Sequence, residues 1–472
     1  LSIRDIRIDS VRAQVGDYKA ELSHASLDLY HLTADSLDAS IHHLRGSLRK
    51  LAPQGKMAEE PFVVEDMQVR FLYNDTLIAL PSLMVRLPHS QLTAQGQYNS
   101  YLHLDITDAT LCPKDISLFV PGLASMDKLL RLQTHVEGDM DSLSVSGLTL
   151  SYNDRKVFQG NAQCKMVSGN WRDAYLRIQC EELAANAAQI QDLVSDIVNR
   201  PFHLPSEIHR LGNMHYRGQI DGNIHDLTLH GAIRTALGVI TTDAALQSDS
   251  TFRQLAYNAR VATNKFRLGK MLAHQPLGPV SLDLRMRGEM KDGINKGKVV
   301  GKIRDVSYNG YTYQAIQIDG KFKPNHFDGM VSINDENLQL QFAGLVDLAE
   351  QAPDINFDLR LQRFRPEILG LSDELRDSEI GLSLAANLSG INPDKMNGYL
   401  VVDSLRLRRG MDSVMLQQIK LTVLAEENDN KHIRLTSDIV TGSLSGAFRY
   451  AEVPYAFLRL AYQYLPNAFP AT

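Results

Sequence analysis

The chain has 472 residues, and its 49 Lys and Arg against 55 Asp and Glu give a formal net charge of −6. This balance disfavours a protein that neutralises nucleic-acid phosphates, so no nucleic-acid partner is expected. An apolar share of 44% and a charged share of 22% exclude a wholly disordered chain. Three cysteines are too few for a disulfide scaffold. The sequence contains no run of about 18 apolar residues, so it predicts no membrane-spanning helix.

Apolar and polar residues alternate along most of the chain, which is the pattern of strands with one buried face. Short polar turns, for example at 308–310 and 426–430, separate the alternating runs. Short connections predict antiparallel neighbours, because parallel pairing needs crossovers of about a dozen residues. In chain order the clearest sets are Leu102/Leu104/Ile106, Leu176/Ile178/Cys180, Leu282/Leu284/Met286, Ile316/Ile318, Leu338/Leu340/Phe342, Ile355/Phe357/Leu359/Leu361, Ile380/Leu382/Leu384 and Ile419/Leu421/Val423.

Helical patterns are few and short, and they fall at 114–120, 181–198, 266–272, 366–375 and 455–465. The longest, 181–198, is rich in Ala, Gln and Leu and is soon followed by Pro201, which cannot continue a helix. These helices are too few to cover so many amphipathic strands. The predicted fold class is therefore mainly β: an elongated, curved, largely antiparallel sheet of repeated modules with short interspersed α-helices.

A weak internal repeat in the sequence supports the prediction that the sheet is built of repeated modules. Phe266 recurs as Phe364 at an offset of 98, and Leu282 and Gly288 recur as Leu384 and Gly390 at an offset of 102. Such repeats stack into structures with an extended concave face. We expect a β-rich segment at 1–105, a β-module ending in a helix at 106–200, a β-module at 201–262, a helix-plus-β module at 263–362, and a helix-plus-β module with a C-terminal short helix at 363–472.

Sequence motifs for catalysis are missing. There is no phosphate-binding glycine loop, zinc-protease motif or calcium loop, and Gly442–Gly446 carries Leu444 where an esterase needs serine. The spacing of the histidines between 203 and 230 does not bring them to one face, so they are interpreted as surface residues. These histidines are His203, His209, His215, His225 and His230. We expect a protein that is not an enzyme, with no catalytic residue, no metal site and no cofactor.

Two functional classes fit an amphipathic sheet with few helices. Either the apolar face holds an apolar ligand, or it packs against a second sheet in a structural or adhesive β-sandwich. The dominance of Leu and Ile favours a lipid groove, because fluid acyl chains adapt to a monotonous lining while a sandwich core needs interdigitating sizes. The residues expected to line this groove are Leu282, Leu284, Met286, Ile316, Ile318, Leu338, Leu340, Phe342, Leu359, Leu361, Leu382, Leu384, Leu388, Ile419 and Leu421.

The order of these patterns resembles a known family. A short helix, a strand ending in L-x-G and a meander returning as L-x-G-x-F resemble the AsmA-like superfamily and, within it, the TamB family of translocation and assembly module subunits. The best-matching stretches are 398–408, 416–424, 433–448 and the helix end at 462–466. The helix-like insert at 181–198 departs from the family pattern.

The resemblance implies a taco-shaped sheet with an apolar interior. It also implies phospholipid transport between the inner and outer membranes, and a role in outer-membrane and envelope biogenesis. The place implied is the periplasm of the cell envelope, with the native protein anchored in the inner membrane. The implied partners are lipid acyl chains and an outer-membrane barrel-assembly protein, the latter bound through a C-terminal region outside this sequence. We therefore expect this chain to be an internal section of a longer one, without the anchor.

Overall fold

Strands dominate the computed structural model, with 73% of the structure in strands and 6% in helices. The structure describes residues 5–8, 11–15, 18–28, 33–34, 43–51, 54–57, 60–74, 76–116, 129–139, 141–152, 155–165, 174–198, 201, 203–249, 251, 253–349, 351–372, 375–392, 394–426 and 430–453. The chain divides into unit 1, Leu1–Ala245, and unit 2, Leu246–Thr472. Strand β18 (Gly238–Ser248) contains the division.

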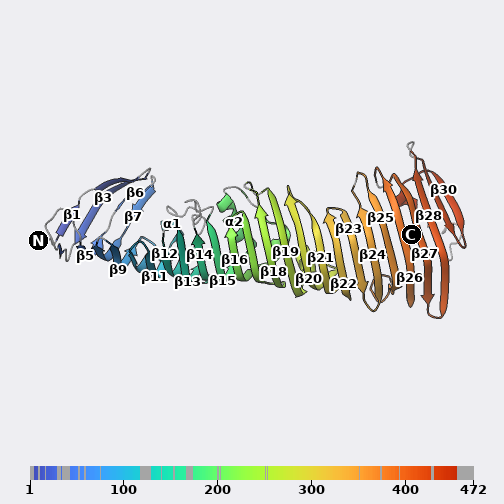
Figure 1. Cartoon of the computed structure of the whole chain (residues 1–472), viewed down its shortest axis with the longest axis horizontal. Coiled ribbons are helices and arrows are strands. Elements are labelled where there is room, and N and C mark those ends of the chain that lie inside the picture. The colour runs from blue at the N-terminus through green and yellow to red at the C-terminus, as the bar shows by residue number, and fades with distance from the viewer. Residues whose placement is uncertain are drawn as a thin grey trace. The chain divides into compact units, whose positions relative to one another are not determined.

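Unit 1 holds a small sheet and a larger one (Figure 1). In the small sheet, β3 pairs with β1, β2 and β6, and β6 pairs with β7. In the larger sheet, β4, β5, β8 and β9 to β17 pair in that order, each antiparallel to the next. The strands are β1 (Asp5–Ile8), β2 (Val11–Val15), β3 (Tyr18–Asp28), β4 (Thr33–Ala34), β5 (His43–Leu51), β6 (Gln54–Met57), β7 (Glu60–Val63), β8 (Asp66–Asn74), β9 (Leu77–Arg86), β10 (Gln91–Tyr98), β11 (Leu102–Leu111), β12 (Leu130–Gly138), β13 (Ser142–Tyr152), β14 (Arg155–Lys165), β15 (Tyr175–Ala185), β16 (Met214–Asn223) and β17 (Asp226–Thr235).

Unit 2 is a meander in which each strand pairs antiparallel with its neighbours in the chain, from β19 to β30 (Figure 1). Short turns such as 309–310 and 324–325 make this possible. The strands are β19 (Gln254–Phe266), β20 (Leu277–Lys291), β21 (Ile294–Tyr308), β22 (Tyr311–Lys323), β23 (His326–Asn334), β24 (Leu338–Asp347), β25 (Asp354–Phe364), β26 (Ser378–Gly390), β27 (Met396–Arg409), β28 (Asp412–Ala425), β29 (Asn430–Ser437) and β30 (Thr441–Ala447). The predicted fold class, a largely antiparallel β-sheet protein with short helices, is confirmed.

The helices differ in detail from their predicted ranges. They are α1 (Pro113–Ile116), α2 (Ala187–Val198), α3 (Ser206–His209), α4 (Leu268–Leu272) and the 3₁₀ turn η3 (Tyr450–Glu452). The predicted helix 181–198 begins too early, because 181–185 complete strand β15. Asn186 sets the true start: its side-chain oxygen accepts from the Gln189 amide at 2.9 Å, and the Gln189 side chain accepts from the Asn186 amide at 2.9 Å. This reciprocal pair is a capping box.

The predicted helix at 366–375 is wrong over the described residues 366–372, which form turns instead. One helical bond forms, from the Leu369 amide to the Arg365 carbonyl at 3.2 Å. Gly370 then adopts a φ of +68°, in the left-handed region, and ends the turn. Helix α4 is shorter than predicted because Phe266 ends strand β19. The predictions at 117–120 and 455–465 lie outside the described residues.

The five predicted modules stay a prediction, although the structure locates their boundaries. The boundaries at 105, 262 and 362 fall inside strands β11, β19 and β25, so no linker separates these modules. The boundary at 200 lies between α2 and α3. The offset repeat corresponds to two strands, β20 and β26, each of which follows a short helical segment or turn.

A small core closes one end of the apolar face in unit 2. Leu369, which is fully buried, packs with Tyr313 and Leu338. Partly buried apolar residues surround these three, namely Val306, Tyr311, Ile316, Ile333, Leu340, Leu361 and Phe364. The turn at 366–370, here called the Leu369 cover, therefore packs over the ends of strands β21 to β25.

Candidate functional site: the apolar face of the sheet

The predicted groove residues all lie in unit 2 and on the same face of its sheet. They come from β20 (Leu282, Leu284, Met286), β22 (Ile316, Ile318), β24 (Leu338, Leu340, Phe342), β25 (Leu359, Leu361), β26 (Leu382, Leu384, Leu388) and β28 (Ile419, Leu421). Side chains alternate between the two faces of a strand, so strand pairing decides which residues meet across the sheet.

Cross-strand register aligns these residues in rows that run from strand to strand. One row, the Leu340 row, consists of Leu282, Ile303, Ile316, Ile333, Leu340, Leu361 and Leu382. The next, the Phe342 row, consists of Leu284, Gly301, Ile318, Val331, Phe342, Leu359, Leu384, Val402 and Ile419. Two continuous apolar rows thus cross most strands of the unit.

A third row combines glycines and apolar residues, and is here called the Gly344 row. It consists of Met286, Val299, Gly320, Gly329, Gly344, Phe357, Ala386, Leu400, Leu421 and Leu435. A Cβ on Gly344 would lie 2.3 Å from the Asn356 carbonyl oxygen, at a φ of +143°. The rings of Phe342 and Phe357 lie 5.2 Å apart beside this glycine. Three adjacent strands therefore have no side chain where the aromatic rings gather, which favours local bending of the sheet.

Nearly all the predicted groove residues are partly exposed. Leu338 is buried beneath the Leu369 cover, while the other members of the predicted set are neither buried nor fully exposed. Along β20, the polar residues Asp283, Arg285 and Arg287 are more exposed than the apolar residues between them. Among the described residues, these apolar side chains shield one another across the strands without a covering layer. Over the described residues of unit 2, the Leu369 cover is the one buried cluster on this face.

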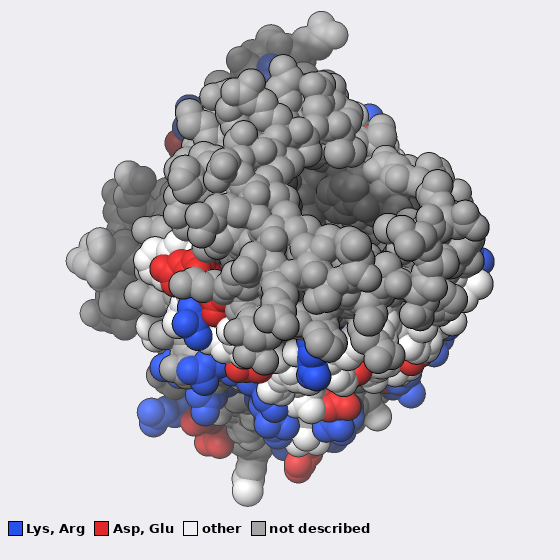
Figure 2. All heavy atoms as spheres, turned by 90° about the vertical axis from the view of Figure 1, so that its left-hand side faces the viewer, with Lys and Arg blue, Asp and Glu red and all other residues white. Residues whose placement is uncertain are grey.

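The opposite face carries charged and amide side chains in the same register. One row consists of Asp283, Lys302, Gln317, Ser332, Gln341, Arg360, Ser383, Asp403 and Gln418. Arg260 donates to both oxygens of Asp283, at 2.9 and 2.7 Å, and this hydrogen bonding lowers the pKa of that carboxyl. Figure 2 shows basic and acidic side chains intermingled over the described surface that it presents.

The apolar face deepens into a hollow of about 640 Å³ near β27 to β30. That volume lies within the usual range of ligand sites. Its lining is almost wholly apolar: Leu388, Met396, Leu400, Leu421, Val423, Ile433, Leu435, Val440, Gly442, Ser443, Leu444, Tyr450 and Val453. Tyr450 and Val453 follow the last strand and form one wall. We call this the C-terminal hollow.

A buried lysine holds that wall in place. Lys431 is 4% exposed. Its Nζ donates to Asp394 at 2.9 Å and lies 5.2 Å from the centre of the Tyr450 ring. The Tyr450 amide donates to Asp394 at 2.8 Å, and its hydroxyl donates to the Met396 carbonyl at 3.0 Å. Burial alone would raise the pKa of Asp394, but the hydrogen bonds and charge of Lys431 lower it overall. Asp394 thus remains ionised at neutral pH.

A second hollow, of about 810 Å³, lies mainly on the polar side of β21 to β27. Its side chains include Lys302, Asp319, Asp358, Arg360 and Asp403. Four predicted groove residues of the Phe342 row, Ile318, Phe342, Leu359 and Leu384, also line this hollow. Its charged side chains suit water better than acyl chains, so we do not assign it to the apolar site.

Sequence reasoning missed several residues of the apolar face. Ile303 on β21, Val331 and Ile333 on β23 and Leu400 on β27 lie in its rows, yet none was predicted. In β27 the neighbour Val401 is also apolar, so alternation does not reveal which residue faces inward. On β21, Gly297 and Gly301 interrupt the apolar pattern. The paired strands supply the missing signal, since each residue takes the face of its cross-strand partner.

Unit 1 has an apolar face of the same kind. Its central row consists of Leu104, Val136, Val145, Ala162, Ile178, Ile220 and Leu229. These residues are also partly exposed. No residue of unit 1 was in the predicted groove set.

Comparison with known proteins identifies no relative: no family model, curated protein or solved structure matches the chain. In the part of the chain that the structure describes, no helix has both the length and the apolar character needed to cross a bilayer.

Proposed function

We propose that the chain is a non-enzymatic lipid-binding sheet, whose apolar face holds the acyl chains of phospholipids and lets them slide along its rows. One observation carries this proposal: apolar residues form continuous rows across unit 2, and apart from those beneath the Leu369 cover most of them remain partly exposed, with no covering layer among the described residues. A large apolar surface of this kind marks a binding site. The almost wholly apolar C-terminal hollow supports the same ligand class.

The energetics of such a site favour acyl chains without selecting a headgroup. Each CH₂ group that leaves water contributes about 0.8 kcal/mol, so a two-chain lipid binds through its tails alone. Headgroups would stay in water at the rim. Moving along a row replaces one apolar contact with another, so the path has no large barrier. Low headgroup specificity follows.

The wider setting is also a proposal, and it rests on the resemblance to the TamB family. The chain would act in the periplasm as a section of a longer protein anchored in the inner membrane. It would carry phospholipid between the inner and outer membranes for envelope biogenesis. A further segment outside this sequence would bind an outer-membrane barrel-assembly protein. Detection of the native full-length protein in the cytosol would contradict this setting.

Site-specific photo-crosslinking tests the apolar face. Leu400 and Leu421 are cross-strand partners on the apolar face, and their chain neighbours Val401 and Lys420 are partners on the polar face. A photoreactive amino acid is placed at each of these positions, and the chain is incubated with radiolabelled phospholipid vesicles. We expect lipid adducts at Leu400 and Leu421 and none at Val401 and Lys420. Equal labelling of both pairs, or none, would mean that the apolar face packs against protein, as in a structural sheet.

A charge on the apolar face gives a second test. Leu421→Asp places an unpaired carboxylate in the C-terminal hollow, where an ion without a partner is strongly disfavoured in contact with acyl chains. We expect phospholipid binding to fall at least tenfold. Val401→Asp adds the same charge to the opposite face and serves as the control, with binding unchanged. Equal effects of the two variants would contradict the proposed site.

A further inference from the structure

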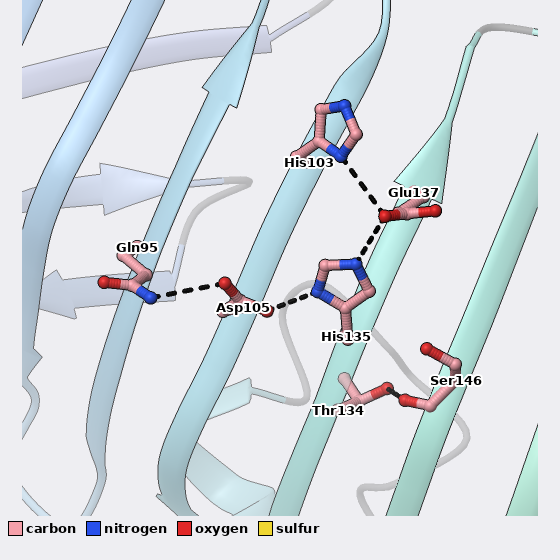
Figure 3. A network of polar contacts seen from close by, with 7 residues as sticks. All are labelled: Gln95, His103, Asp105, Thr134, His135, Glu137 and Ser146. Atoms are coloured by element: carbon pink, nitrogen blue, oxygen red, sulfur yellow. Dashed lines mark hydrogen bonds and ion pairs between the residues drawn. The ribbon is translucent and has the colours of Figure 1, made fainter.

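Two histidines and two carboxylates meet on the polar face of unit 1 (Figure 3). His103 and Asp105 lie on β11, and His135 and Glu137 lie on β12. The register pairs His103 with Glu137 and Asp105 with His135. The four side chains therefore project from the same face, opposite the apolar row of that unit.

Three of these side chains, His103, His135 and Glu137, have the spacing of a metal site. The Glu137 Oε1 atom lies 2.8 Å from His135 Nε2 and 3.3 Å from His103 Nδ1. Their three ligand atoms all lie within 4.8 Å of one another. Bonds of 2.0–2.2 Å to a tetrahedral zinc ion separate neighbouring ligand atoms by about 3.3–3.6 Å. Small rotations of these partly exposed side chains would bring the three atoms to that spacing.

Asp105 fixes the orientation of His135. One Asp105 oxygen is hydrogen-bonded to His135 Nδ1, and Gln95 donates to the other at 3.2 Å. This leaves Nε2 of His135 directed at Glu137, as Figure 3 shows. Histidine ligands of metal ions commonly donate their other ring N–H to a carboxylate, which sets the tautomer and the ring orientation. His103 packs against the ring of Tyr101, with centroids 5.0 Å apart.

Two other histidine–carboxylate contacts among the described residues of unit 1 do not show this convergence. His215 approaches Glu182, and His230 approaches Asp243, with one histidine in each contact. Among the described residues a second group with ligand spacing is His89, Cys112 and Asp115. There, however, one oxygen of Asp115 already accepts from the His89 amide at 2.9 Å and the Ser90 hydroxyl at 2.7 Å.

We propose that His103, His135 and Glu137 bind a Zn²⁺ ion, with Asp105 as the residue that positions His135. Two imidazoles and a carboxylate are ligands that zinc accepts, and three protein ligands leave one coordination position open to water or to a further ligand. The ion would join β11 to β12 on the face away from the apolar row. This site is separate from the proposed lipid site in unit 2.

Metal titration of the whole chain tests the assignment. Zn²⁺ binding is measured by calorimetry, and Co²⁺ serves as a spectroscopic probe, because its visible absorption reports nitrogen and oxygen ligands in a site of low coordination number. We expect saturable binding that is lost in His103→Ala and in His135→Ala. Glu137→Gln keeps a hydrogen-bond acceptor while removing the charge, and should also abolish binding. Asp105→Asn should weaken binding by about 10- to 100-fold.

Two matched variants serve as controls. His230→Ala removes a histidine with one carboxylate contact in the same unit, and His89→Ala removes a ligand of the alternative group. Both should bind Zn²⁺ as the unchanged chain does. The proposal is overturned if the chain shows no saturable binding, if binding survives in a variant that lacks both His103 and His135, or if His89→Ala alone abolishes it. Circular dichroism of each variant verifies that the sheet is retained.

Discussion

Replacing Leu369 with alanine should detach the Leu369 cover from the sheet. Leu369 is fully buried, whereas its neighbour Ile368 is 50% exposed. Its side chain is the part of the turn that packs with Tyr313 and Leu338. The turn also has polar links to the sheet: the Tyr313 hydroxyl donates to the Leu369 carbonyl at 3.4 Å, and the Asn309 side chain donates to the Gly370 carbonyl. Leu369→Ala therefore removes the main apolar contact of the cover.

The size of the effect follows from the burial of this side chain. Leucine-to-alanine changes at fully buried sites cost about 2.7–5.0 kcal/mol, and the larger values belong to sites that cannot collapse. A single turn on the sheet surface can collapse partly into the cavity that the substitution leaves, so we expect Leu369→Ala to cost about 3 kcal/mol of the free energy that holds the cover closed. At about 1.4 kcal/mol per factor of ten, this raises the population of the open cover by roughly 100-fold.

Hydrogen exchange measures that population directly. The Leu369 and Leu371 amides are bonded to the Arg365 and Pro366 carbonyls, and they should exchange up to roughly 100-fold faster in Leu369→Ala. Ile368→Ala is the control, and as a surface change it should alter exchange by about twofold at most. An acceleration below tenfold in Leu369→Ala, or equal acceleration in both variants, would refute the packing argument.

Two further predictions concern the sheet of unit 2. Gly344→Ala should destabilise the unit by about 2 kcal/mol or more, because its Cβ would meet the Asn356 carbonyl oxygen at a strained φ; Gly442→Ala, with open space at its Cβ, should change thermal stability little. His326 holds the pKa of Asp347 at about 2, below its usual 3.8, so the stabilisation is complete above about pH 4 and is lost as the pH falls towards 2. Urea unfolding across that range should show a loss of about 1 to 2 kcal/mol that Asp347→Asn lacks; an identical pH profile in that variant would contradict the assignment.

Alternation was sufficient to predict the strands and much of the apolar face. Leu282, Leu284 and Met286 stand between charged residues, so a single strand already indicates which side chains leave water. The same reasoning fails where both neighbours are apolar, as at Leu400, Val401 and Val402. There the inward residues follow from pairing with the next strand, which a single sequence pattern does not contain.

Contacts between residues far apart in sequence account for the other misses. Leu338 alternates like Leu340 but lies beneath Leu369, because the turn after β25 folds back over the sheet. His103 and His135 belong to separate strands, so no short motif could place them together; the register of β11 with β12 does so. The predicted helix from 181 began too early because Leu183, Ala184 and Ala185 pair with β16, so strand β15 continues as far as the Asn186 capping box.

Pairing of each strand with its chain neighbours also determines how unit 2 can assemble. Strand pairing stays between chain neighbours, and the Leu369 cover is a later contact across several strands. Closing each new turn of the meander therefore costs little loop entropy, in contrast to sandwiches whose strands pair over long separations. Stability in such an array is approximately a sum of nearest-neighbour interfaces. Folding can therefore proceed hairpin by hairpin along the chain, because each paired strand offers its free edge to the strand that follows.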